Sequence, residues 1–121
     1  MERYYDTMRQ MIMLTDTGIE SLEYLEAKLK SDSDGVPMYL FFDFIEAFIQ
    51  LCKAYRILEA KLMKSIHELE EEVAKGLITF NYAFKAGDML SMVNLLDIHL
   101  IPAAKAYRNE LAALLNPHIL C

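Results

Sequence analysis

Two pairs of side chains in this sequence have a spacing that could support metal binding or acid–base chemistry. His67 and Glu71 are four residues apart in a stretch with helical periodicity, so both could project from one helix face and ligate a metal. Asp43 and Glu46 form a carboxylate pair one helical turn apart. Two acids one turn apart usually form a solvated stripe, and this pair has no visible partner base. For His67, a surface or capping role is favoured over metal ligation. We therefore predict no catalytic residue and no metal ligand.

Motifs for cofactor or nucleophilic chemistry are equally scarce. A di-iron bundle needs two Glu-x-x-His pairs, and the sequence contains none. It also has no Gly-x-Ser-x-Gly turn, and its four glycines form no phosphate-binding loop. Cys52 lies in an apolar run and is expected to be a core residue, because a reactive thiolate needs a polar, cation-rich setting. We expect a non-enzymatic protein without a cofactor.

Charge and hydropathy exclude two classes of partner. The formal charge is -6, from 12 basic and 18 acidic side chains, and the basic residues are not segregated on one face, which disfavours a phosphate backbone. Charged residues interrupt every apolar run before the ~18 residues that a membrane span needs. The N-terminus shows no secretory signal, and the two cysteines have no disulfide spacing. We predict a cytoplasmic protein that binds neither nucleic acid nor membrane.

Helical periodicity divides the 121 residues into four segments that would form one domain. They span residues 2 to 30, 37 to 62, 66 to 86 and 89 to 115. Gly18 lies on the apolar stripe of the first segment and suggests close approach of a neighbouring helix. Gly87 and Asp88 read as a helix stop followed at once by an N-cap. The expected fold is an antiparallel up-down-up-down four-helix bundle, residues 1 to 121.

Three boundaries rest on single features of the sequence. Ser65 and Glu68 fit a capping box, so we place a break between residues 62 and 65. The alternative is a three-helix protein with one long helix over residues 37 to 75. Pro102 predicts a kink near residues 98 to 102, and Asn116-Pro117 predicts the end of the last helix.

The second segment is more apolar than a monomer's core requires. An ordinary bundle helix needs about three apolar positions per heptad, whereas here the only polar residues in the middle form one narrow stripe: Asp43, Glu46, Gln50 and Lys53. We predict that part of this helix covers a second subunit, giving a homodimer, or a helix of a partner protein. The predicted partner-binding residues are Phe41, Phe42, Phe44 and Phe48.

The function that follows is a non-enzymatic protein–protein interaction module, either a homodimer or a chaperone-like adaptor, that uses an apolar surface on this helix. The alternative from another class is a metal- or small-ligand-binding helical bundle. It would use His67, His99, Asp43 or Glu46 around an internal cavity.

The sequence also resembles two families. Its Gly18-Ile19 pair with a following apolar stripe, and the acid between the last two helices, resemble flagellin-type export chaperones. That resemblance implies a four-helix bundle whose hydrophobic groove holds the helical end of an export substrate. The stretch from Gly87-Asp88 to Pro102, with Tyr5 and Gly18-Ile19, is similar to an uncharacterised family of small bacterial helical domains. This second resemblance implies an all-helical fold and no known activity.

Overall fold

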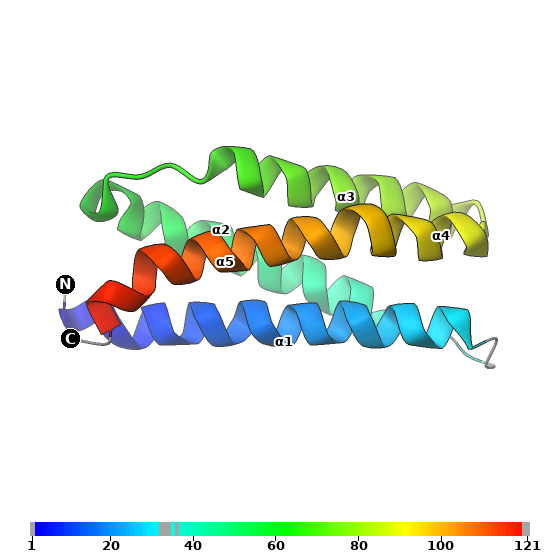
Figure 1. Ribbon diagram of the computed structural model, residues 1–121, viewed down its shortest axis with the longest axis horizontal. Helices are drawn as coiled ribbons and strands as arrows, with labels where there is room; N and C mark the ends of the chain where they lie inside the picture. The colour runs from blue at the N-terminus through cyan, green and yellow to red at the C-terminus, as the bar shows by residue number, and fades with distance from the viewer. Residues whose placement is uncertain (1, 32–34, 36, 120–121) are drawn as a thin grey trace.

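The computed structural model describes residues 2 to 31, 35 and 37 to 119, and this part of the chain is entirely helical apart from its connections. Figure 1 shows neighbouring helices running in opposite directions, so that the start of α1 and the end of α5 lie at the same end of the bundle. The predicted up-down-up-down bundle is therefore confirmed. In chain order the elements are η1 (Glu2–Tyr4), α1 (Tyr5–Lys30), α2 (Tyr39–Leu62), α3 (His67–Lys85), α4 (Met89–Leu95), the π-helical turn η2 (Leu96–Leu100) and α5 (Ile101–Ile119).

The connection between α2 and α3 lies where it was predicted. Met63 takes the left-handed conformation, with φ of 53°, and its N–H donates to the Glu59 carbonyl at 2.8 Å. A left-handed residue ends a helix, so the alternative of one long helix over residues 37 to 75 is wrong. The predicted capping box is also wrong, because the Ser65 hydroxyl accepts a hydrogen bond from the backbone N–H of His67, and Ile66 occupies the N-cap position.

The turn between α3 and α4 follows the predicted chemistry closely. Gly87 has φ of 68°, which a glycine adopts without steric cost, and its N–H donates to the Phe84 carbonyl. Asp88 then caps α4, accepting a bond from the Ser91 N–H at 3.1 Å and another from the Ser91 hydroxyl at 2.7 Å. Both hydrogen bonds to the cap lower the pKa of the Asp88 carboxyl.

The bundle consists of four helical rods, and the fourth is formed by α4, η2 and α5, which follow one another without a break (Figure 1). The irregularity expected at Pro102 takes the form of a π-helical turn, in which the Ile101 N–H donates to the Leu96 carbonyl five residues earlier. Pro102 has no N–H, and the widened turn before it relieves the clash of its ring with the preceding turn. The expected stop at Asn116-Pro117 is wrong, because α5 continues through Pro117 to Ile119.

The core lies between the four rods and contains two close helix contacts. A Cβ on Gly18 of α1 would lie 3.0 Å from the Phe44 ring of α2, which confirms the close approach expected there. A Cβ on Gly76 of α3 would lie 3.3 Å from the Cα of Leu100 in η2. Among the largest fully buried side chains are Met8, Leu22, Leu25, Phe41, Tyr55, Leu58, Phe80, Leu96, Leu100, Leu111 and Leu115.

Among the described residues, no helix is both long and apolar enough to cross a membrane.

Candidate protein-binding groove

The four phenylalanines predicted to bind a partner divide unequally between core and surface. Phe41, Phe44 and Phe48 are 0%, 7% and 8% exposed, so they belong to the monomer's core. Phe41 packs against Phe80 of α3, with ring centroids 4.5 Å apart. Phe42 is 50% exposed. The candidate surface therefore shifts from the whole aromatic cluster to Phe42 and the side chains around it.

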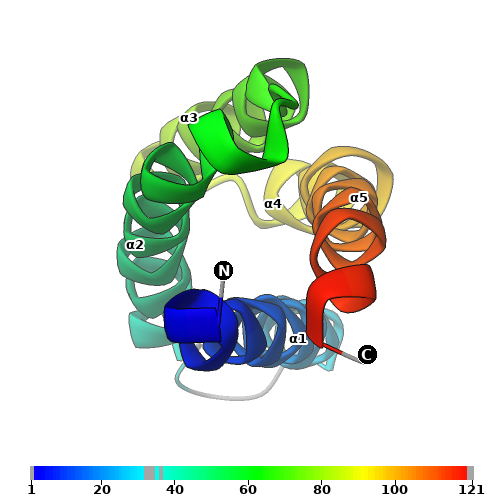
Figure 2. The ribbon, with the colours of Figure 1, turned by 90° about the vertical axis from the view of Figure 1, so that its left-hand side faces the viewer.

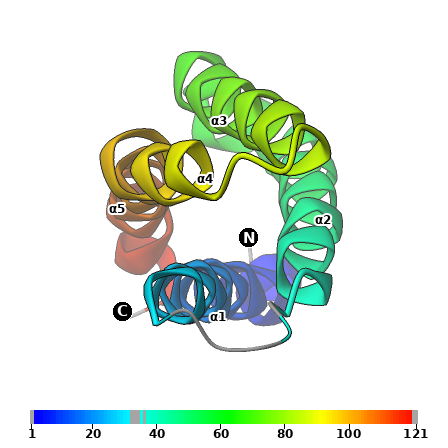
Figure 3. The ribbon, with the colours of Figure 1, turned by 90° about the vertical axis from the view of Figure 1, so that its right-hand side faces the viewer.

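Those neighbours form an open groove between α2 and α3. It has a volume of about 410 Å³ and its walls are almost entirely hydrocarbon. Viewed along the bundle axis, α2 lies between α1 and α3 (Figures 2 and 3). The residues that line the groove are Phe42, Ile45, Phe48 and Ile49 from α2, and Ala74, Leu77, Ile78 and Asn81 from α3.

The groove exists because α2 and α3 approach each other less closely than the other neighbouring helices do. The backbone of α1 packs tightly against both α2 and α5, and α3 packs against α4 and α5. Near the start of α2, the rings of Phe42 and Phe84 meet edge to face at 6.2 Å. Towards its end, Arg56 donates to both carboxylate oxygens of Glu70 at 2.6 Å. These two contacts connect the helices near the two ends of the groove.

The Arg56–Glu70 pair lies close to Cys52 of α2, whose thiol is influenced first by burial and then by Glu70. Glu70 is buried and Arg56 remains partly exposed, so the bidentate contact satisfies a carboxylate that the core would otherwise strand. Burial, together with the nearby Glu70 carboxylate, raises the pKa of the Cys52 thiol to about 12. Cys52 is therefore a protonated thiol at neutral pH, which agrees with the core role expected of it.

The polar stripe predicted on α2 is exposed along its whole length. Asp43, Glu46, Gln50 and Lys53 all face solvent. They are not the only exposed residues there, because Ile49 and Ile57 are 48% and 62% exposed. The excess of apolar residues on α2 is thus partly external.

Sequence reasoning missed the contribution of α3 to this surface. Ile78 is 58% exposed and forms the outer edge of the groove opposite Ile49. The signal was present, since Ile78 stands beside the apolar stripe through Leu77 rather than on it. A large apolar residue displaced from a core stripe marks a second apolar face on the helix.

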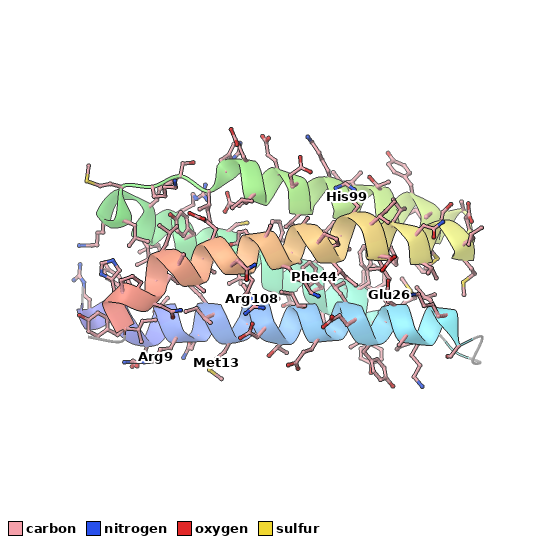
Figure 4. The ribbon with its side chains drawn as sticks, in the orientation of Figure 1. Arg9, Met13, Glu26, Phe44, His99 and Arg108 are labelled. Atoms are coloured by element: carbon pink, nitrogen blue, oxygen red, sulfur yellow. The ribbon has the colours of Figure 1, made fainter. Side chains whose placement is uncertain are left out.

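The residues considered for metal binding do not converge. His67 pairs with Glu71 at 2.9 Å on the outer surface of α3, whereas Nε2 of His99 lies 3.7 Å from Glu72. Figure 4 shows His99 on the rod formed by α4, η2 and α5, where it faces α3. Within the described part of the chain, no group of three or more His, Cys, Asp and Glu side chains could hold a metal ion.

The small space inside the core is lined by none of the residues considered for ligand binding, His67, His99, Asp43 and Glu46. The enclosed space beside Phe44, Phe48 and Tyr107 has a volume of about 10 Å³. That is enough for about one water molecule, whereas small-ligand pockets are about 300 Å³ or larger. Tyr107 lines this space, and burial raises the pKa of its hydroxyl group.

The fold and this surface together define an antiparallel four-helix bundle with an apolar groove open to solvent. The chain belongs to the DUF8042 family, a domain of unknown function whose model matches residues 6 to 110. The match includes Gly18-Ile19, Gly87-Asp88 and Pro102, so membership of an uncharacterised domain family is confirmed. No curated protein and no solved structure matches the chain significantly.

Proposed function

We propose that this protein is a non-enzymatic, cytoplasmic protein–protein interaction module that binds an apolar helix in the groove between α2 and α3. The observation that carries the proposal is the composition of the groove. Phe42, Ile49 and Ile78 are each about half exposed around a cleft with almost no polar wall. Side chains of this size gain about 25 cal/mol for each Å² of apolar surface that a partner removes from water.

The shape of the groove favours a helix as the bound element. Its two walls are formed by the neighbouring helices α2 and α3, and a third helix can pack into the space between two helices as it does in an ordinary bundle. The lining residues Ile45 and Ile49, and Ala74 and Ile78, recur at the four-residue spacing that receives the ridges of another helix. An amphipathic helix would therefore extend the packing already present in the core.

Two kinds of helix fit this proposal. A helix from a second copy would make the protein a homodimer, and a helix from another protein would make it a chaperone-like adaptor. Both use the same groove, so both are sensitive to a charge placed on its floor or edge.

The test combines light scattering with fluorescence of the dye 8-anilinonaphthalene-1-sulfonate. We expect the wild-type chain either to self-associate or, as a monomer, to bind the dye. Ile78→Lys should reduce whichever signal is observed, because it places an ammonium group beside Leu77 and Ile49. Ile98→Lys is the matched control, since Ile98 is 73% exposed and does not line the groove.

Two outcomes would contradict the proposal. One is a wild-type monomer that binds no dye, because its apolar surface would then offer no binding site. The other is an equal loss of signal in Ile78→Lys and Ile98→Lys, because the signal would then not come from the groove.

A further inference from the structure

Five of the exposed side chains on the outward face of α2 follow one another at steps of four, three, four and four residues. This spacing places them within one arc of the helix surface. Read from either end, the series alternates apolar and charged residues, and the two charges have opposite signs. We call this set the α2 stripe: Phe42, Glu46, Ile49, Lys53 and Ile57.

The α2 stripe borders the groove, because two of its residues, Phe42 and Ile49, line it. A helix lying on the stripe would therefore cover the α2 side of the groove. The stripe is long enough for a continuous contact, since the 24 residues of α2 span about 36 Å.

The two charges of the stripe have no counter-ion among the residues that the structure describes. Glu46 and Lys53 are seven residues apart, about 10 Å along the helix axis, which is too far for a direct ion pair. Neither forms an ion pair with any other residue in the described part of the chain. Both charges therefore flank exposed apolar side chains without being neutralised.

We infer that the helix covering the α2 side of the groove is α2 of a second copy, docked antiparallel about a two-fold axis near Ile49. Turning the stripe end for end brings Glu46 of one copy beside Lys53 of the other, and does so twice by symmetry. The same operation places Phe42 against Ile57 and brings the two Ile49 side chains together at the axis. The inference rests on the proposed function, because it names the occupant of the same groove.

Charge complementarity sets the direction of this pairing. A parallel arrangement would place Glu46 against Glu46 and Lys53 against Lys53, whereas the antiparallel one satisfies all four charges. The apolar contacts supply the affinity, and the ion pairs select the register. One stripe is thus complementary to itself without any second partner surface.

The test is sedimentation equilibrium of the full-length chain and of two charge-reversal variants, alone and mixed. The wild-type chain should form a dimer. Glu46→Lys and Lys53→Glu should each weaken dimerisation at least tenfold, because each turns two attractive contacts into two repulsive ones. An equimolar mixture of the two variants should recover the dimer, since one chain then carries only basic and the other only acidic stripe charges. Glu20→Lys, at an exposed site on α1, controls for net charge.

Three results would overturn the inference: a monomeric wild-type chain at 1 mM (about a thousandfold above a micromolar Kd), a dimer indifferent to both reversals, or no recovery on mixing. The first two leave the proposed function separately testable. A monomer that binds the dye in the groove retains that function and loses the self-pairing. A dimer that ignores the stripe charges uses another face.

Discussion

The seam between α1 and α5 and the groove between α2 and α3 lie on different sides of the bundle. They differ in the side chains that border them. Charged side chains bridge the α1–α5 seam: Arg108 lies 3.4 Å from Asp16, and Lys105 lies 3.3 Å from Glu23. Figure 4 shows Arg108 between the two helices, whereas Arg9 and Met13 point away from the outer side of α1. The α2–α3 groove has apolar side chains where this seam has charged ones.

This difference affects the access of a partner to apolar side chains more than it affects the stability of the fold. Surface ion pairs contribute about 0.2–1 kcal/mol each, so they do not hold α1 against α5. Their aliphatic stems do cover the apolar edge of that seam, because long charged side chains lie along it and keep their charges in water. Along the α2–α3 groove the exposed residues are Phe42, Ile49 and Ile78, which leave hydrocarbon open to a partner.

The largest expected effect separates the core from the wall of the groove on the same helix. Phe41→Ala should lower the free energy of unfolding by about 3–5 kcal/mol, because Phe41 is fully buried against Phe80. Phe42→Ala should cost about 1 kcal/mol or less, since half of that side chain is already in water. Urea denaturation of both variants measures the contrast. Equal losses would show that the wall of the groove is part of the core.

The next effect tests the close contact between Gly76 of α3 and Leu100 of η2. Gly76→Ala should destabilise the fold by about 1–3 kcal/mol, despite alanine's higher helix propensity, because the new methyl group meets the backbone of Leu100. The matched variant Lys75→Ala changes an exposed position in the same turn. Thermal unfolding that ranks Gly76→Ala as the more stable variant would show that α3 has room to move.

A pH-dependent effect is expected on the α1 side of the bundle at Glu26. Burial raises the pKa of the Glu26 carboxyl above its ordinary value of 4.5; the Lys30 ammonium opposes the rise and the Asp97 carboxylate adds to it. The native state then holds a proton that the unfolded chain has released, so stability falls as pH rises from 4.5 through the raised pKa. Glu26→Gln should remove this fall and be more stable above that window.

Urea titrations at several pH values, with exposed Glu20→Gln as control, measure this difference. A wild-type stability that increases across the same pH window, with no flattening in Glu26→Gln, would contradict the assigned environment of Glu26.

The smallest effect concerns the two ion pairs of the α1–α5 seam. Arg108→Gln and Lys105→Gln should each change the free energy of unfolding by only about 0.2–1 kcal/mol, because both partners of each pair are partly exposed. Dye binding should rise in the double variant if these side chains cover the seam. Unchanged dye binding in the double variant would show that Arg108 and Lys105 do not cover the α1–α5 seam, so that this seam and the α2–α3 groove would not differ in access.

Much of the fold was predictable because its determinants are local. Helical periodicity identified the four rods, and Gly87 and Asp88 fixed one turn through backbone freedom and capping. The extension of α5 past Pro117 was not predictable, because a proline in the last turn costs few hydrogen bonds and is tolerated there. The π-helical turn before Pro102 was not predictable in that form, because a proline indicates a local irregularity and periodicity does not tell a kink from a widened turn.

The candidate site was predictable only as an excess of apolar residues on one helix. Phe42 and Phe44 are two residues apart, and periodicity over an almost wholly apolar helix does not tell which of them faces α1 or α3. The groove also depends on the wider separation of α2 and α3, a property of the assembled bundle. Ile78 became part of the site only when its neighbour across the groove was known.

Disulfide trapping at Ile49 is the sharpest test of the antiparallel pairing of α2 in two copies, because the inferred two-fold axis passes near this residue. Ile49→Cys would be made in a chain carrying Cys52→Ala and Cys121→Ser, with Ile98→Cys as the matched exposed position. Mild oxidation should convert Ile49→Cys to a covalent dimer, since two cysteines at a two-fold axis meet the ~5.5–6 Å Cα separation of a disulfide. Ile98→Cys should stay monomeric. Equal cross-linking of both variants, or none at Ile49→Cys, would contradict the account.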